Sequence, residues 1–383
     1  MAEKIQYLEG IRGTAAFVVY LGHFCPLFIT SSSFFIALIT GLFFFGRVFC
    51  VCIFFILSGY VLTYTFFKSR NQVVLVSGAV RRYIRLLIPV LFLILIVYLF
   101  IAPGPEGLMN ANAIKTMLSQ AFLGVFVQGQ YVPFIANSTE YTAVLWTMTI
   151  EFIGSFIVFS FASLFGKLRN RWVFYIVAVL VFLNTYYLAF ILGMALADLS
   201  FCDAFKKYKK LKNPGFAATV FLIGLLLGSY PVIPFFEPVY SFIDWVVQSV
   251  FSALSFISLS PFQTGSTSAL VFIYITGAFF ILAALLNSGW LQGVFSSRIL
   301  VFLGKISFSL YLIHMVVILT FSYFILGILF GNTLNLFTGI CIFFITTLVL
   351  LGCSFLMYKY VDLSGITFSK RAYNQFFAEN RIK

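Results

Sequence analysis

Runs of about twenty apolar residues recur along the whole sequence, and this feature limits the chain to very few folds. The 383 residues are 62% hydrophobic and only 9% charged, with a mean hydropathy of +1.07. A soluble domain has about 25% charged residues, so this composition excludes that class. Within a bilayer, backbone polar groups must be paired inside each segment, which favours helices. The sequence therefore predicts an all-α, polytopic transmembrane bundle in contact with the lipid bilayer.

Ten segments have the length and composition of membrane-crossing helices. They are residues 13–30, 41–66, 84–101, 144–165, 172–184, 186–199, 214–230, 268–286, 306–327 and 335–357. No stretch between them is long enough for a separate soluble domain. We therefore predict one integral membrane domain over residues 1–383, with a short cytoplasmic tail at residues 358–383.

The distribution of positive charge predicts the orientation of these spans. With the N-terminus in the cytoplasm, all 24 Lys and Arg residues except Arg47 and Lys115 fall on the cytoplasmic side. This predicts cytoplasmic termini and a multi-pass protein of the plasma membrane, and it explains the net charge of +13 without a nucleic-acid partner. Counting residues 121–128 as another span would invert every later loop. We therefore expect residues 102–143 and 231–267 to form external or re-entrant segments.

Arg12 and His23 interrupt the first apolar segment with two ionisable side chains. On a helix, an offset of eleven residues is about three turns, so both side chains project from nearly the same face. The rise of about 1.5 Å per residue places His23 roughly 16 Å deeper than Arg12. Ionisable residues inside a membrane are costly and are functional candidates by default. The pair indicates a polar cleft that runs from one surface into the membrane.

Arg82 and Arg85 are three residues apart at the predicted cytoplasmic start of the third helix, so they share a face. Planar guanidinium groups bind phosphate oxygens in pairs of hydrogen bonds, and Arg12 at the same surface would add a third group. The alternative is that these arginines only flank a membrane span, as the topology requires.

Polar residues also occur within two later spans. Glu151 follows Trp146 in the fourth span, where a carboxylate needs a partner or a proton; His23 or an arginine is the natural partner, and a solvated helix end is the alternative. Ser307, Tyr311 and His314 form a polar stripe on the ninth span. A buried histidine of this kind is more often a hydrogen-bonded scaffold than a catalyst.

Several common catalytic patterns do not occur in the sequence. It has no Gly-rich phosphate loop, no Gly-x-Ser-x-Gly elbow and no His-Glu-x-x-His motif. The six cysteines lie mostly in apolar runs without the spacing of a metal site, so we expect no metal cofactor. Because the chain has only two histidines, the choice of a general base near neutral pH is narrow.

Taken in order, five segments make the chain similar to the acyltransferase-3 family of integral membrane acyltransferases. They are RGTAAFVVYLGH (residues 12–23), FFILSG (54–59), RYIR (82–85), the Trp146 to Glu151 segment, and GKISFSLYLIH (304–314). The resemblance covers residues 5–360. It implies transfer of an acyl group, commonly acetyl, from cytoplasmic acyl-CoA to a hydroxyl of a saccharide, lipid-linked or similar acceptor.

The resemblance also implies roles for single residues. It assigns His23 as the catalytic histidine and three arginines as required basic residues, which we expect to bind the acyl-CoA donor (acetyl-CoA): Arg12, Arg82 and Arg85. We add Glu151 as a second catalytic candidate and expect three side chains to contact the substrate: Trp146, Tyr311 and His314. The chain has one glutamate near Trp146 where a pair is common in the family, which leaves the role of Glu151 open.

Two other classes of function fit the same residues. Histidine, glutamate and arginine inside a bundle also suit a proton-coupled small-molecule transporter, and a non-catalytic membrane scaffold would keep the same fold. The sequence has no internal repeat and no matched pair of Gly/Pro-broken helices, which are typical of many transporters. We therefore favour the acyltransferase.

Overall fold

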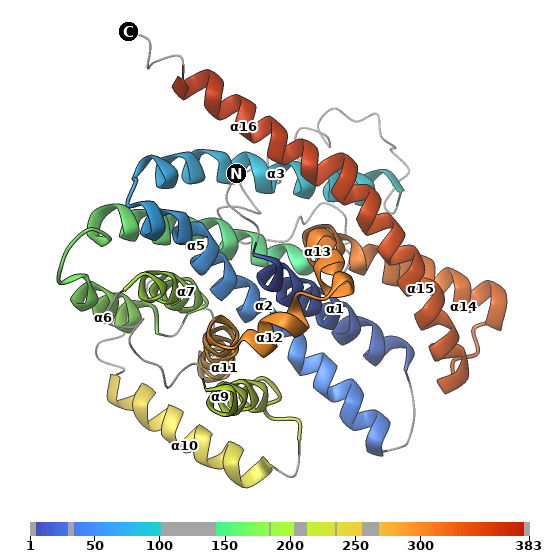
Figure 1. The fold of residues 1–383 in the computed structure, drawn as a ribbon. Helices are drawn as coiled ribbons and strands as arrows, with labels where there is room; N and C mark the ends of the chain where they lie inside the picture. The colour runs from blue at the N-terminus through green and yellow to red at the C-terminus, as the bar shows by residue number, and fades with distance from the viewer. Residues whose placement is uncertain are drawn as a thin grey trace. The chain divides into compact units, whose positions relative to one another are not determined.

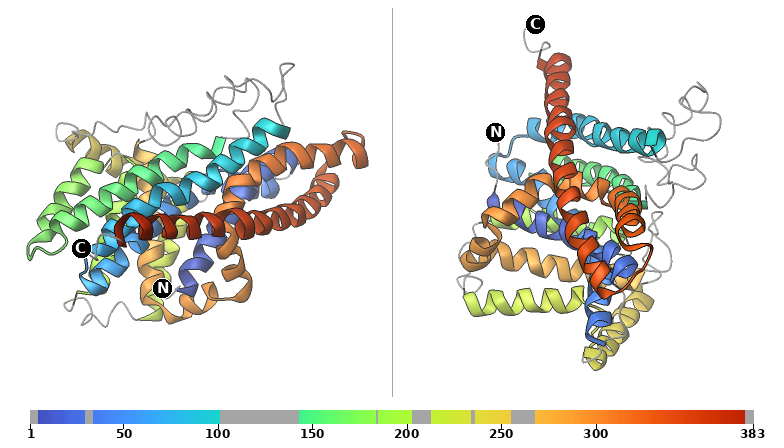
Figure 2. Two further views of the ribbon diagram at one scale, coloured as in Figure 1. Left: turned by 90° about the horizontal axis from the view of Figure 1, so that it is seen from above. Right: turned by 90° about the vertical axis from the view of Figure 1, so that its right-hand side faces the viewer.

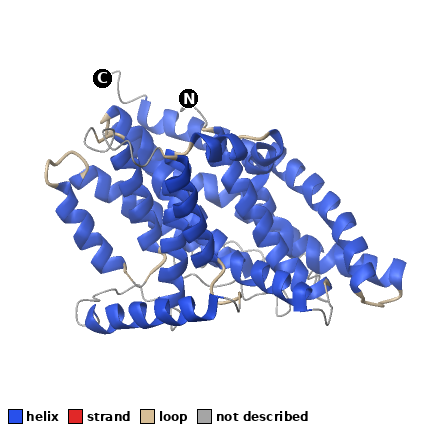
Figure 3. Cartoon of the chain, turned by 60° about the horizontal axis from the view of Figure 1, so that its bottom comes forward, coloured by secondary structure: helices blue, strands red, loops and turns tan. Residues whose placement is uncertain are grey.

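The computed structural model describes residues 5–29, 34–100, 143–183, 185–202, 213–233, 236–254 and 268–378. In this part of the chain the regular structure is helical and no strand occurs (Figure 3). Six helical stretches are long and apolar enough to cross a membrane: Gln6–Phe28, Ile36–Ser69, Ala143–Phe165, Ala269–Asn287, Arg298–Phe330 and Leu336–Gln375. The prediction of an all-α transmembrane protein is confirmed.

Each of the ten predicted spans overlaps a helix (Figure 1). The α-helices are α1 (Gln6–Phe28), α2 (Phe34–Ser69), α3 (Val73–Phe100), α5 (Trp146–Phe165), α6 (Arg171–Phe182), α7 (Tyr187–Ser200), α9 (Pro214–Gly228), α10 (Glu237–Leu254), α11 (Ser268–Asn287), α12 (Gly289–Phe295), α13 (Arg298–Val317), α14 (Tyr323–Phe330), α15 (Leu336–Met357) and α16 (Leu363–Ala378). The number of crossings and the cytoplasmic side of the termini stay predictions.

Some helices begin earlier than expected. Helix α3 begins at Val73 and not at 84, because the preceding residues are also apolar and because Asn71 accepts a hydrogen bond from the Val73 amide at 2.9 Å. Arg82 and Arg85 therefore lie inside α3 and not at its start, which corrects the sequence prediction. Helix α13 likewise begins at Arg298 and not at 306.

Two segments expected to be non-helical contain helices. Helix α10 lies within the predicted external segment 231–267. At the other end, α15, a π-helical turn (Tyr358–Asp362) and α16 follow one another as one long helical run where a tail was expected (Figure 2). The run 121–128 and the Lys-rich stretch 206–212 lie outside the described residues.

The chain divides into two compact units. The first consists of Met1–Gly22, Ser33–Val76 and Gly154–Gly304, and the second of His23–Ser32, Ser77–Ile153 and Lys305–Lys383. Helices α1, α3, α5 and α13 each contribute residues to both units. The prediction of a single domain over residues 1–383 stays a prediction.

A buried ion pair joins three helices of the first unit. Asp198, near the end of α7, is fully buried and accepts hydrogen bonds from Nε and Nη2 of Arg171 at 2.5 and 3.0 Å. Arg70, just after α2, lies 3.8 Å from the same carboxylate. Burying a carboxylate is affordable only when it is paired, so the two arginines explain how Asp198 lies inside the protein.

Glycines also let α1 approach α12 and the start of α13 with their backbones in contact. A methyl group added at Gly304 would lie 2.1 Å from the carbonyl oxygen of Glu9, and one at Gly13 would lie 2.4 Å from the amide nitrogen of Gly304. At Gly10 it would lie 1.8 Å from the carbonyl oxygen of Phe295. Small residues permit such close packing of membrane helices. The N-terminal half of α1 is thus in backbone contact with α12 and the start of α13.

We expect Gly304→Ala to destabilise the protein, because the backbone atoms that its methyl group would meet cannot move aside. Overpacking of this kind costs about 1–3 kcal/mol, which would lower the midpoint of thermal unfolding in detergent. Gly352→Ala in α15 is the matched control, since no neighbouring atom lies within 4 Å of its added methyl group. Equal unfolding temperatures for the two variants would contradict the backbone contact.

Candidate functional site

The two histidines of the chain meet in the second compact unit. His314 on α13 is fully buried, and its Nε2 lies 3.3 Å from Nδ1 of the half-buried His23 on α1. The centroids of the two rings are 5.0 Å apart. The sequence singled out each histidine separately, and the structure brings them together in one hydrogen bond.

Tyr311 connects α13, the helix that carries His314, to the start of α5. Its hydroxyl lies 3.0 Å from Oγ1 of Thr147 and donates to the carbonyl oxygen of Val144 at 3.3 Å. The carbonyl oxygen of Tyr311 lies 2.7 Å from Nδ1 of His314. All four residues are buried. One tyrosine therefore connects the histidine pair to α5 through both its side chain and its backbone.

Glu151 lies one turn beyond Thr147 on α5 and forms an ion pair with Arg82 of α3. The two side chains are only 13% and 9% exposed. Of the two partners expected for Glu151, His23 or an arginine, the structure shows an arginine. The carboxylate of Glu151 thus balances most of the charge of Arg82 inside the protein. Arg85, three residues later on α3, is exposed.

Two further predicted site residues have clear positions. Arg12 lies on α1 in the first compact unit, with 33% of its side chain exposed and its Nη1 4.0 Å from Oε1 of Glu9. Helix α1 is continuous from Gln6 to Phe28, so Arg12 and His23 lie on one helix, as the sequence predicted. Trp146 is the first residue of α5 and is half-buried beside Thr147 in the sequence.

A family model described as an acyltransferase domain matches residues 5–359, which is nearly the whole chain. The chain belongs to the acyltransferase-3 family. Together with the apolar helices, this makes it an integral membrane acyltransferase. No match was found among curated proteins or among solved structures.

Thr147 is a member of this candidate site that sequence analysis missed. Threonine is common in apolar helices, where its hydroxyl usually bonds to its own backbone, as Thr147 also does to Val144 at 2.9 Å. Nothing local marks it as the partner of Tyr311. The one indication in the sequence is that Thr147 precedes Glu151 by four residues, which places both side chains on one helical face.

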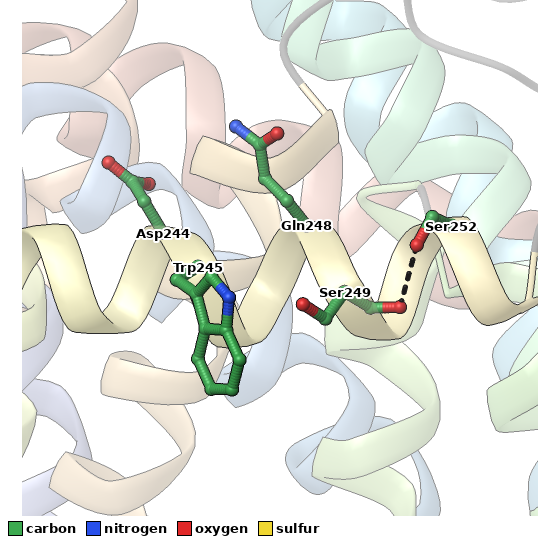
Figure 4. A pocket seen from close by; sticks show the side chains of 5 residues that line it. All are labelled: Asp244, Trp245, Gln248, Ser249 and Ser252. Carbon is green, nitrogen blue, oxygen red and sulfur yellow. Dashed lines mark hydrogen bonds between the residues drawn. The ribbon is translucent and has the colours of Figure 1, made fainter.

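A separate cavity of about 420 Å³ lies on α10 of the acyltransferase (Figure 4). Its lining residues are Asp244, Trp245, Gln248, Ser249 and Ser252, and none of them is a predicted site residue. Asp244 accepts a hydrogen bond from the Tyr230 hydroxyl at 2.5 Å. This contact helps to hold α10 in place.

No three His, Cys, Asp or Glu side chains of the described residues are grouped in a way that would hold a metal ion. The structure instead brings together two imidazoles, a phenol, a threonine hydroxyl and an arginine that is paired with a glutamate. These groups of the acyltransferase are suited to proton transfer and hydrogen bonding.

We expect Arg82→Leu and Glu151→Leu each to destabilise the acyltransferase, because each removes the opposite charge from beside a buried group. The typical cost is roughly 3–5 kcal/mol, measurable as a lower midpoint of thermal unfolding in detergent. The double variant removes both charges and should recover much of the loss. For a direct pair, the destabilisation of the double variant differs from the sum of the two single effects. Purely additive destabilisation would therefore contradict the ion pair.

Proposed function

We propose that this acyltransferase moves an acyl group, acetyl in the simplest case, from cytoplasmic acyl-CoA to a hydroxyl group of a saccharide or lipid-linked acceptor at the plasma membrane. His23 acts as the general base. The observation that carries this proposal is the hydrogen bond between His23 on the first transmembrane helix and the buried His314. It supports an imidazole held in one orientation within the membrane.

The proposed reaction is a direct transfer. The acceptor oxygen attacks the thioester carbonyl carbon while His23 removes the hydroxyl proton, so that a C–O bond forms and the C–S bond breaks. His23 then returns the proton to the leaving thiolate, which releases free CoA and the acyl ester. General base catalysis of this kind is worth about 10²–10⁴-fold in rate.

The basic residues are the proposed anchor for the CoA phosphates. Arg85 is exposed on α3, and Arg82 beside it is oriented by Glu151. Arginine binds phosphate oxygens in a planar fork. Arg12, in the first unit, is a further candidate for a phosphate contact, because its positively charged side chain is partly exposed.

The remaining predicted residues have supporting roles in this proposal. Trp146 presents an aromatic ring at the start of α5, where it can contact an acceptor, and Tyr311 together with Thr147 fixes that part of the site. Glu151 acts through Arg82 and so is a positioning residue rather than a second base.

His23→Ala should abolish acyl transfer and leave binding of CoA intact, because it removes the base and not the anchor. The test is transfer of label from radiolabelled acetyl-CoA to candidate saccharides by the purified protein in detergent, with CoA binding measured by calorimetry. Thr14→Ala is the control on the same helix, since its hydroxyl bonds to the Gly10 carbonyl oxygen one turn earlier. Full transfer by His23→Ala would refute the assignment, and uptake into proteoliposomes without label transfer would favour a transporter.

Arg85→Lys keeps the positive charge but loses the planar fork, so we expect a higher apparent KM for acyl-CoA with kcat little changed. Saturation curves against acetyl-CoA measure this. Arg169→Lys is the matched control, because Arg169 is exposed in the turn between α5 and α6 on the same predicted side of the membrane. If both variants saturate like the wild type, Arg85 serves topology and not the donor.

A further inference from the structure

We propose that His314 is a positioning residue that holds His23 in the tautomer with its proton on Nδ1, so that the basic lone pair of His23 lies on Nε2. The catalytic consequence rests on the proposed role of His23 as the base. The hydrogen-bond arrangement itself rests only on the contacts of the two rings.

The first step concerns the proton on His314. Nδ1 of His314 lies 2.7 Å from the carbonyl oxygen of Tyr311, one turn earlier on α13. A carbonyl oxygen only accepts hydrogen bonds, so Nδ1 must be the donor. The proton position is thus assigned from the partner atom, as is usual for histidine.

The second step concerns the charge of His314. The ring is fully buried, and the partners that the structure describes for it are backbone carbonyl oxygens, of Tyr311 and Leu310, and another imidazole, none of them an anion. A buried cation without a counter-charge is strongly disfavoured. With Nδ1 protonated in a neutral ring, Nε2 of His314 carries the lone pair and accepts the hydrogen bond.

The third step concerns the position of the proton on His23. The group 3.3 Å from Nε2 of His314 is Nδ1 of His23, which must therefore carry a proton. A neutral imidazole has one N–H and one lone pair, so the lone pair of His23 lies on Nε2. When that atom takes the proton of the acceptor, the bond from Nδ1 to His314 is retained and stabilises the imidazolium.

A neutral acceptor differs from the carboxylate that orients the histidine in many hydrolases. It fixes the tautomer and the ring orientation without adding a charge, and charges inside a membrane are costly. Tyr311 completes the arrangement, because its hydroxyl bonds to α5 and so holds the turn whose carbonyl oxygen accepts from His314.

The test uses the fact that the chain has only two histidines. Protein labelled with ¹⁵N-histidine and purified in detergent gives two imidazole signal sets, and ¹⁵N chemical shifts distinguish a protonated ring nitrogen from a bare one. At neutral pH we expect a protonated Nδ1 and a bare Nε2 in both rings. A protonated Nε2 on either ring in the wild type would overturn the proposal.

Two variants separate positioning from folding. In His314→Gln the amide oxygen can still accept from Nδ1 of His23, so the tautomer and part of the turnover should be retained. In His314→Leu that acceptor is lost, and we expect the Nδ1 proton preference of His23 to disappear and kcat to fall about 10–100-fold, the effect typical of losing the partner that orients a metal-binding histidine. KM for acetyl-CoA should not change.

Ser309→Ala is the matched control, since Ser309 is buried on the same helix and its hydroxyl has no hydrogen-bond partner among the described residues. If His314→Leu does not fold, the wild-type spectrum and His314→Gln still decide the outcome. Absence of acyl transfer in the wild type would refute the proposed function while the tautomer assignment still holds. Normal transfer with an unchanged His23 tautomer in His314→Leu would refute positioning alone.

Discussion

The hydrogen bond between His23 of α1 and the buried His314 of α13 is the interaction on which the proposed chemistry of the second unit depends. It lies among apolar residues, where each polar group needs a partner. Within the first unit, Gly13 and Gly304 let the backbones of α1 and of the start of α13 come into contact. A side chain at either glycine would force these backbones apart.

Two carboxylates inside the molecule are each paired with an arginine. Asp198 is held by Arg171 in the first unit, and Glu151 by Arg82 in the second. Such pairs add little to stability compared with apolar packing, but they make the removal of one partner costly. Arg85 is exposed on α3, unlike Arg82, which is why we propose that it binds the phosphates of the donor.

Much of the fold was predictable because apolar runs and helical spacing are local properties of the sequence. Helix α10 was missed because its segment was assigned to the exterior, although its polar residues recur every three to four positions, as in an amphipathic helix. The sequence limited the partner of Glu151 to a histidine or an arginine, but only the packing of α3 against α5 identifies that partner as Arg82. The contact between the histidines lay beyond local reasoning, because 291 positions separate them in the chain.

The hydrogen bond between the two histidines also limits which side chains can replace His314. A substitute must keep a hydrogen-bond acceptor facing Nδ1 of His23, or the proposed base loses its orientation. A carboxylate would accept that bond but would add a charge inside the membrane, which is costly. Under the proposed mechanism, position 314 therefore tolerates few residue types.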